Sequence, residues 1–184
     1  MNNPTGFALK RPGYFARRLT LQDADILQRL YEQCTAFFHL TDGLSPAPTA
    51  AREEFDDLPA GKTSADNYIF GLFNAQQELA GMIAGIRHYP DAQTWWIGLM
   101  MVAPEYRGRG LGADFYRAFE RWVEAQGISK ISLVAIEANE RGLQFWLRMG
   151  FKIMRKTPPR QYKAKTHAVY VLSQTVERIS PALI

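Results

Sequence analysis

Residues 102–112 read VAPEYRGRGLG, and this loop between an apolar stretch and an amphipathic one decides the predicted fold. Its glycines permit positive φ angles and a close approach of the backbone to a ligand. The first turn of the following helix leaves N–H groups without intrahelical partners, and these groups and the helix dipole attract a phosphate. Arg107 and Arg109 add positive charge at the same place. The stretch therefore predicts a loop that binds a diphosphate.

The sequence on both sides of the loop predicts a strand, a helix and a second strand. Residues 94–102 and 128–136 are apolar runs of strand length. Between them, apolar side chains recur at the spacing of one helix face, and a glycine stands where a helix C-cap belongs. These residues are Leu111, Phe115, Phe119, Trp122, Val123 and the capping Gly127. The unit is therefore a crossover between two strands of one sheet.

The rest of the chain predicts short strands, turns and a few helices. Expected strands cover residues 14–18, 68–73, 78–88, 151–155 and 167–176, and expected helices begin at Thr20 and cover residues 49–57 and 139–148. Hairpins combined with one crossover indicate an α/β (α+β) fold. We expect a mixed, mostly antiparallel sheet of about seven strands flanked by about four helices.

Two other nucleotide-binding loops fit the sequence less well. A nucleoside triphosphate loop would continue with Gly-Lys-Ser/Thr, which does not follow here. Residues 108–113 satisfy the dinucleotide pattern Gly-x-Gly-x-x-Gly/Ala. That pattern also needs an acidic residue at a strand end ~20 residues later, and residues 130–136 contain none.

A second motif follows the strand at residues 128–136. Residues 139–151 read NERGLQFWLRMGF, in which Asn139 is a good helix N-cap and Gly150 ends the helix. This motif, together with the Arg-x-x-Gly-x-Gly spacing of residues 107–112, resembles the GNAT superfamily of N-acetyltransferases. We therefore expect a single N-acetyltransferase domain over residues 14–178, preceded by a loose tail over residues 1–13.

The resemblance implies acetyl-CoA as cosubstrate and a sheet that splays between its fourth and fifth strands, residues 94–102 and 128–136. The pantetheine arm would lie in that gap and pair with backbone groups of Met101 and Val102. Asn139 would bond the same arm while capping its helix, and a cap alone is an equally good interpretation. Loop amides would hold the diphosphate, and they belong to Arg107, Gly108, Arg109, Gly110, Leu111 and Gly112.

The resemblance also implies direct attack of a primary amine on the thioester, but the sequence departs from the family at the acid. Many members carry a Tyr where this chain has Trp146. An indole N–H donates a hydrogen bond but does not usefully release its proton, so Trp146 is a pocket wall, a donor to sulfur, or a packing residue. Glu137 is a candidate base through a water, or a solvated loop carboxylate. Water, Tyr106 or Tyr116 then remain as the acid.

Composition restricts the other possibilities. With 47% hydrophobic and 22% charged residues, the 184-residue chain fits one globular domain. The net charge of +4 suits a polyanionic cofactor, and no nucleic-acid motif accompanies it. No run approaches the ~18 apolar residues of a membrane span. Three histidines and the lone Cys34 lack metal-ligand spacing. We expect a cytoplasmic protein without membrane, nucleic-acid or metal partners.

No motif specifies the acceptor. We expect a small-molecule or peptide amine, and a homodimer is possible because dimers are common in the family. His39 and Asp42, in a predicted loop over residues 39–48, could line the amine pocket or lie on the surface. The basic loop of residues 157–166 could meet an anionic acceptor or be a solvated hairpin tip. The alternative function is a non-catalytic acyl-CoA-binding module, which would keep the phosphate loop without proton-transfer groups.

Overall fold

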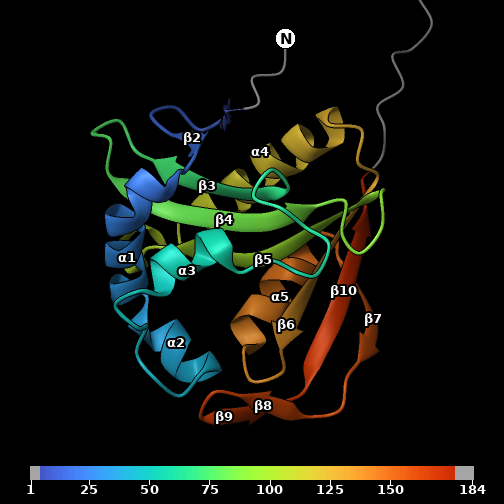
Figure 1. Ribbon diagram of the computed structural model, residues 1–184. Helices are drawn as coiled ribbons and strands as arrows, with labels where there is room; N and C mark the ends of the chain where they lie inside the picture. The colour runs from blue at the N-terminus through green and yellow to red at the C-terminus, as the bar shows by residue number, and fades with distance from the viewer. Residues whose placement is uncertain (1–4, 177–184) are drawn as a thin grey trace, which may run out of the picture.

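An eight-stranded sheet in the order β1-β2-β3-β4-β5-β6-β10-β7 runs through the molecule (Figure 1). The computed structural model describes residues 5–176, and in this part of the chain only β5 and β6 are parallel neighbours in the sheet. A separate two-stranded sheet joins β8 to β9. The predicted mixed, mostly antiparallel sheet is confirmed. The predicted domain end at residue 178 and the first four residues of the predicted tail lie outside the described residues.

The elements alternate between hairpins and helices along the chain. The strands are β1 (Gly6–Ala8), β2 (Phe15–Arg18), β3 (Asn67–Phe73), β4 (Leu79–Arg87), β5 (Thr94–Val102), β6 (Lys130–Ile136), β7 (Lys152–Lys156), β8 (Arg160–Tyr162), β9 (Lys165–His167) and β10 (Val169–Thr175). The helices are α1 (Ala24–Gln33), α2 (Thr35–Thr41), α3 (Ala50–Asp56), α4 (Leu111–Ala125) and α5 (Glu140–Arg148), with short 3₁₀ turns at Leu21–Asp23 and Pro104–Tyr106.

Helices cover both faces of the sheet, and alternate strand residues divide between the two cores. Ile69 and Met82 pack with the helices α1, α2 and α3. Their chain neighbours Phe70 and Ile83 pack with α4 and α5 on the other face. This division follows from the two-residue period of a strand, which turns successive side chains to opposite faces. In Figure 1, α1 and α3 lie in front of the sheet and α4 behind it.

The helix α4 buries the side chains that its spacing predicted. All five apolar residues of the predicted face belong to the core on this side of the sheet, namely Leu111, Phe115, Phe119, Trp122 and Val123. Gly127 has φ 79°, a left-handed conformation that suits the glycine expected at the helix end. The crossover from β5 to β6 is thus fixed to the sheet along the whole length of α4.

Three segments differ from the sequence prediction. Gly6–Ala8 forms β1 and pairs with β2, so this part of the predicted tail belongs to the sheet. The helix expected to begin at Thr20 is interrupted at Cys34, and α2 occupies the start of the predicted loop of residues 39–48. The predicted basic loop of residues 157–166 contains β8 and the first two residues of β9. All three are short, and their formation depends on contacts with distant residues, which local periodicity does not report.

We predict that Gly85→Ala destabilises the fold. A Cβ on Gly85 would lie 2.4 Å from the indole nitrogen of Trp95 and 2.6 Å from the carbonyl oxygen of Trp96. Trp95 is fully buried and cannot withdraw, so the free energy of unfolding should fall by about 2 kcal/mol. Gly98→Ala is the control, because its Cβ would meet no atom closer than 4.0 Å. Equal denaturant midpoints for the two variants would contradict this account.

Candidate functional site

The parallel strands β5 and β6 pair only in their first halves. Their ladder runs from Thr94 opposite Lys130 to Ile97 opposite Leu133. β5 nevertheless continues to Val102 and is paired with β4 from Trp95 to Val102, except at Gly98. The register between β4 and β5 shifts at Gly98, which is an extra residue in β5. Such a bulge bends the strand that carries it, and here it stands where the pairing with β6 ends.

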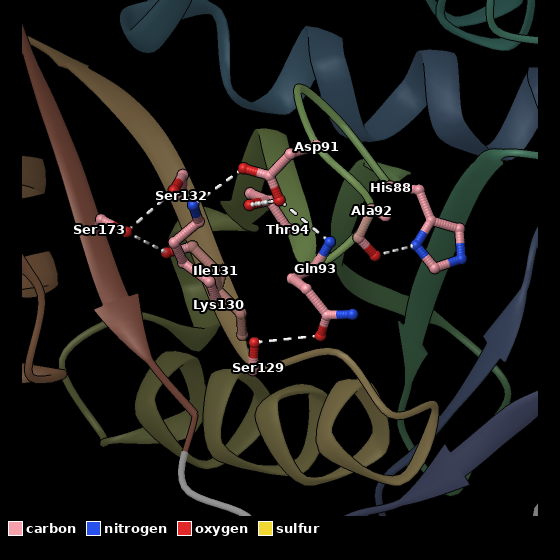
Figure 2. A network of polar contacts seen from close by, with 10 residues as sticks. All are labelled: His88, Asp91, Ala92, Gln93, Thr94, Ser129, Lys130, Ile131, Ser132 and Ser173. Atoms are coloured by element: carbon pink, nitrogen blue, oxygen red, sulfur yellow. Dashed lines mark hydrogen bonds and ion pairs between the residues drawn. The ribbon is translucent and has the colours of Figure 1, made fainter.

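A polar network fixes the paired ends of β5 and β6 (Figure 2). Asp91 accepts hydrogen bonds from the Thr94 hydroxyl at 2.7 Å and the Gln93 N–H at 3.0 Å, and it pairs with Lys130 at 3.0 Å. The Thr94 hydroxyl and then Lys130 lower the pKa of Asp91. The amides of Ser129 and Lys130 donate to the Gln93 carbonyl at 3.3 and 3.1 Å. The strands are therefore held together at one end.

His88 also belongs to this end of the sheet. Its Nδ1 lies within hydrogen-bonding distance of the Ala92 carbonyl oxygen, and its backbone has φ 56° (Figure 2). It thus supports the turn before β5.

Beyond the bulge, alternate residues of β5 direct their backbone groups away from β4. The Ala103 N–H donates to the Ala80 carbonyl at 2.8 Å, so this is a hydrogen-bonded antiparallel pair. Hydrogen-bonded and non-hydrogen-bonded pairs alternate along an antiparallel ladder, so the backbone N–H and C=O groups of Met101 also point toward β4. Those of Met100 and Val102 point to the other side, where β6 lies. The β6 side of this strand thus presents backbone groups of Met100, which sequence reasoning missed, and of Val102. Met101, predicted together with Val102 to pair with the pantetheine arm, directs its backbone groups toward β4.

The glycine loop, residues 103–110, leads into α4 in the manner expected of a phosphate site. Gly108 and Gly110 have φ 76° and 79°, and Gly110 is the N-cap of α4. A Cβ on Gly108 would meet no atom within 4 Å, so its backbone angle and not crowding favours glycine there. The Asp114 N–H donates to the Gly110 carbonyl at 3.1 Å. The preceding amides, those of Leu111, Gly112 and Ala113, are the first-turn donors without an intrahelical acceptor.

The two arginines of this loop differ in their contacts. Arg109 is exposed beside the start of α4. Arg107 folds back, and its Nε donates to the Val102 carbonyl at 2.7 Å while Nη2 contacts the sulfur of Cys34 at 3.2 Å. Arg107 therefore supports the end of β5, a role that its spacing did not predict. Burial raises the pKa of the Cys34 thiol, which belongs to the core beside α1, α2 and α3.

The helix α5 brings the Asn motif next to the glycine loop. Asn139 caps α5, because its Oδ1 accepts a hydrogen bond from the Gly142 N–H at 3.0 Å. Its Nδ2 is the remaining donor of the same amide. A Cβ on Gly112 would lie 3.6 Å from Val102 Cγ2 and 3.7 Å from Phe145 Cε2. The end of β5, the start of α4 and α5 thus meet at one place.

The two catalytic candidates have other contacts. Trp146 is 9% exposed and packs against aromatic rings of Tyr116, Phe145 and Phe151 at centroid distances of 5.3, 4.9 and 5.2 Å. Glu137 is about half exposed and forms an ion pair with Lys156. This geometry favours packing for Trp146 and a surface ion pair for Glu137.

Both tyrosines considered as the acid have hydroxyls that are hydrogen-bonded to side chains outside β5 and β6. The Tyr116 hydroxyl donates to Gln174 in the core, and burial raises the pKa of Tyr116. Tyr106 accepts a hydrogen bond from Asn74 at 3.0 Å and donates to Glu78 at 3.4 Å, which connects the glycine loop to the β3–β4 turn. Both hydroxyls therefore have structural partners.

The basic hairpin, residues 160–167, contacts the C-terminal end of α2. Lys163 pairs with Asp42 at 2.7 Å, the Ala164 N–H donates to the Asp42 carbonyl at 3.0 Å, and His167 Nε2 lies 3.0 Å from the Thr41 carbonyl oxygen. In Figure 1 the hairpin and α2 lie together at the bottom of the molecule, near α5. His39 instead contacts Ser45 at 3.2 Å. Asp42 is thus a hairpin contact and not a free loop carboxylate.

Comparison with known proteins identifies the class. The sequence model of the Acetyltransferase (GNAT) family matches residues 25–151, and this chain belongs to that family. It is a GNAT acetyltransferase, and acetyl-CoA is the cosubstrate of the family. No curated protein matches the chain. Within the described residues, no helix is long and apolar enough to cross a membrane.

Solved structures share the fold at low sequence identity. An acetyltransferase from Thermus thermophilus has a TM-score of 0.72 at 21% identity, covering 88% of this chain and 96% of its own. Spermidine N-acetyltransferase from Vibrio cholerae, in complex with CoA and spermine, has a TM-score of 0.69 at 14% identity, covering 90% and 97%. The ribosomal-protein-S18-alanine N-acetyltransferase from Escherichia coli has a TM-score of 0.67 at 11% identity, covering 93% and 99%.

We predict that the stability of α5 depends on an oxygen at position 139. Asn139→Ala removes the cap of the Gly142 N–H and should lower the free energy of unfolding by about 1 kcal/mol. Asn139→Asp keeps a capping oxygen and should leave stability near that of the unmodified chain. Urea titration followed by far-ultraviolet circular dichroism measures both. Equal losses in the two variants would show that the cap is not what stabilises the helix.

Proposed function

We propose that this chain transfers the acetyl group of acetyl-CoA to a primary amine by direct attack of the amine on the thioester. The observation that carries the proposal is the meeting of three elements: the unpaired half of β5, the glycine loop at the start of α4, and the Asn-capped α5. Each offers backbone or amide donors of the kind that bind a diphosphate and an amide-containing chain. Family membership supports the same activity.

Different parts of the site would bind different parts of acetyl-CoA. The loop amides from Gly108 to Gly110 and the first-turn amides of α4 bind the diphosphate, whereas the Arg107 amide donates to the Pro104 carbonyl at 3.2 Å. Backbone groups of Met100 and Val102 pair with the pantetheine arm as an added strand would, and Asn139 Nδ2 donates to the same arm. A β5 amide in this unpaired half donates to the carbonyl oxygen of the thioester. That donor stabilises the negative charge that develops as the amine adds.

Proton transfer requires little from the side chains. The attacking amine must be neutral, because an ammonium has no lone pair. The nitrogen of the tetrahedral intermediate then loses one proton to water, the C–S bond breaks, and the thiolate takes a proton, which leaves a neutral amide and the free thiol of CoA. A thiol pKa near ~8.5 lets water supply that proton near neutral pH. The contacts of Trp146 and of both tyrosines support water as the acid, and Glu137 acts as base only if it leaves Lys156.

We expect Gly110→Glu to abolish acetyl-CoA binding. The new carboxylate would stand at the N-cap of α4, where the proposed diphosphate binds, and like charges repel. Gly110→Ala is the matched control, since it carries the same backbone strain at φ 79° without the charge. Titration calorimetry should show a dissociation constant for the Glu variant at least ~100-fold above that of the Ala variant. Similar dissociation constants for the two variants would show that the diphosphate does not bind at this loop.

Turnover separates the enzyme from the alternative binding module. A panel of small-molecule and peptide amines, assayed by release of free CoA thiol, should reveal at least one acceptor. Saturable acetyl-CoA binding without thiol release on any amine would instead favour the non-catalytic module. We expect residues at the contact between α2 and the basic hairpin to determine which amine is accepted.

We therefore predict that Asp42→Ala raises the KM for the acceptor amine and leaves acetyl-CoA affinity unchanged. The substitution removes the ion pair with Lys163 and loosens the hairpin from α2. Lys163→Ala should reproduce the effect, and Lys163→Arg should preserve acceptor KM because it keeps the charge. The expected change in KM is about threefold to tenfold. A change in acetyl-CoA affinity of the same size would place this contact in the cofactor site.

A further inference from the structure

The N-terminal segment is fixed against the start of α4 by two kinds of contact. β1 pairs with β2, from Gly6 opposite Arg17 to Ala8 opposite Phe15. The Phe7 ring packs against Phe115 of α4 at a centroid distance of 6.1 Å and against Phe70 of the sheet at 5.1 Å. The chain that follows β1 is therefore held beside the first turns of α4.

Arg11 uses this placement to contact the glycine loop directly. Its Nε donates to Asp114 Oδ2 at 2.6 Å, and its Nη2 donates to the Arg109 carbonyl at 2.9 Å. The same Nη2 would lie 3.4 Å from a Cβ built on Gly110. The side chains of Arg11 and Asp114 are 37% and 38% exposed, so solvent reaches the pair. A guanidinium has five N–H donors, and these two contacts use only part of them.

The bond to Arg109 orients the next peptide amide. In a trans peptide the C=O and the following N–H point in opposite directions. With the Arg109 carbonyl held by Arg11, the Gly110 N–H points away from Arg11. Gly110 has φ 79° and could otherwise take many conformations, as glycines do. Arg11 thus fixes the direction of one of the amides that the loop offers to a diphosphate.

The ion pair also removes an unfavourable charge. Asp114 lies within one turn of Gly110, because its N–H donates to the Gly110 carbonyl. A free carboxylate there would repel a diphosphate at the same helix end. Arg11 neutralises Asp114 and adds a guanidinium within reach of the loop.

We propose that Arg11 is a positioning residue for the diphosphate of acetyl-CoA, acting by orienting the Gly110 amide and by neutralising Asp114. The inference rests on the proposed function of the glycine loop. It assigns a role in the cofactor site to a segment that the sequence predicted to be a loose tail.

Titration calorimetry with CoA and acetyl-CoA on the full chain tests the proposal. Arg11→Gln should weaken binding about tenfold, as expected for loss of a charge-assisted contact. Arg11→Lys keeps the charge without the two-point contact and should recover part of the affinity. Arg17→Gln is the control, because Arg17 forms a comparable pair with Asp23 at 2.7 Å in an unrelated part of the sheet. Its affinity should equal that of the unmodified chain.

The double variant Arg11→Gln/Asp114→Asn distinguishes a specific role from a general loss of structure. Removing the carboxylate removes the repulsion, so this variant should bind more tightly than Arg11→Gln alone. In steady state, Arg11→Gln should raise the KM for acetyl-CoA with kcat nearly unchanged, because the lost contact stabilises the bound substrate and the transition state equally. Equal affinity of the Arg11→Gln and Arg17→Gln variants, with the unmodified chain binding normally, would overturn the role of Arg11. Failure of the unmodified chain to bind CoA would instead overturn the proposed function.

Discussion

Backbone pairing between β5 and β6 stops after Ile97 and Leu133, and the candidate site depends on that interruption. Unpaired N–H and C=O groups at a strand edge are costly to bury and readily accept another chain. The Gly98 bulge ends the ladder, while the network around Asp91 keeps the other end closed. The result is a parallel pair that is fixed at one end and, at the other, presents backbone groups of β5 that have no partner strand on the β6 side. An amide-containing arm such as pantetheine matches those groups.

The packing of α4 against the sheet fixes the position of the glycine loop, which is the second part of the candidate site. The apolar face of α4 is buried against the sheet, with Leu111 and Phe115 nearest to the glycine loop. Farther along α4, the Tyr116 hydroxyl donates to Gln174 of β10, and Gln174 donates to Glu120 at 2.7 Å. These contacts prevent the helix from turning on the sheet. The helix dipole and the first-turn amides consequently point at a fixed place beside the end of β5.

In the mechanism that we propose, the side chains near the site do little acid–base chemistry. Trp146 is held by neighbouring aromatic rings, and Glu137 is paired with Lys156. Under the proposed function, the site would accelerate acyl transfer by orienting the two reactants and by providing a fixed backbone donor for the oxyanion. We propose that α2 and the basic hairpin, which share an ion pair and two backbone contacts, determine the choice of amine.

The sequence by itself determined the elements with a strong local pattern. The bounds of β5 agree with the predicted strand of residues 94–102. The helix α5 begins at the predicted cap Asn139, and α4 ends just before the predicted cap Gly127, because asparagine, glycine and apolar spacing act within one element. The tertiary structure alone decided which strand edge is free, that Met100 and not Met101 faces it, that Arg107 turns back to Val102, and that Arg11 reaches the glycine loop. Register, bulges and ion pairs between distant segments join residues far apart in the chain, and no local periodicity records which partner a backbone group or an arginine will find.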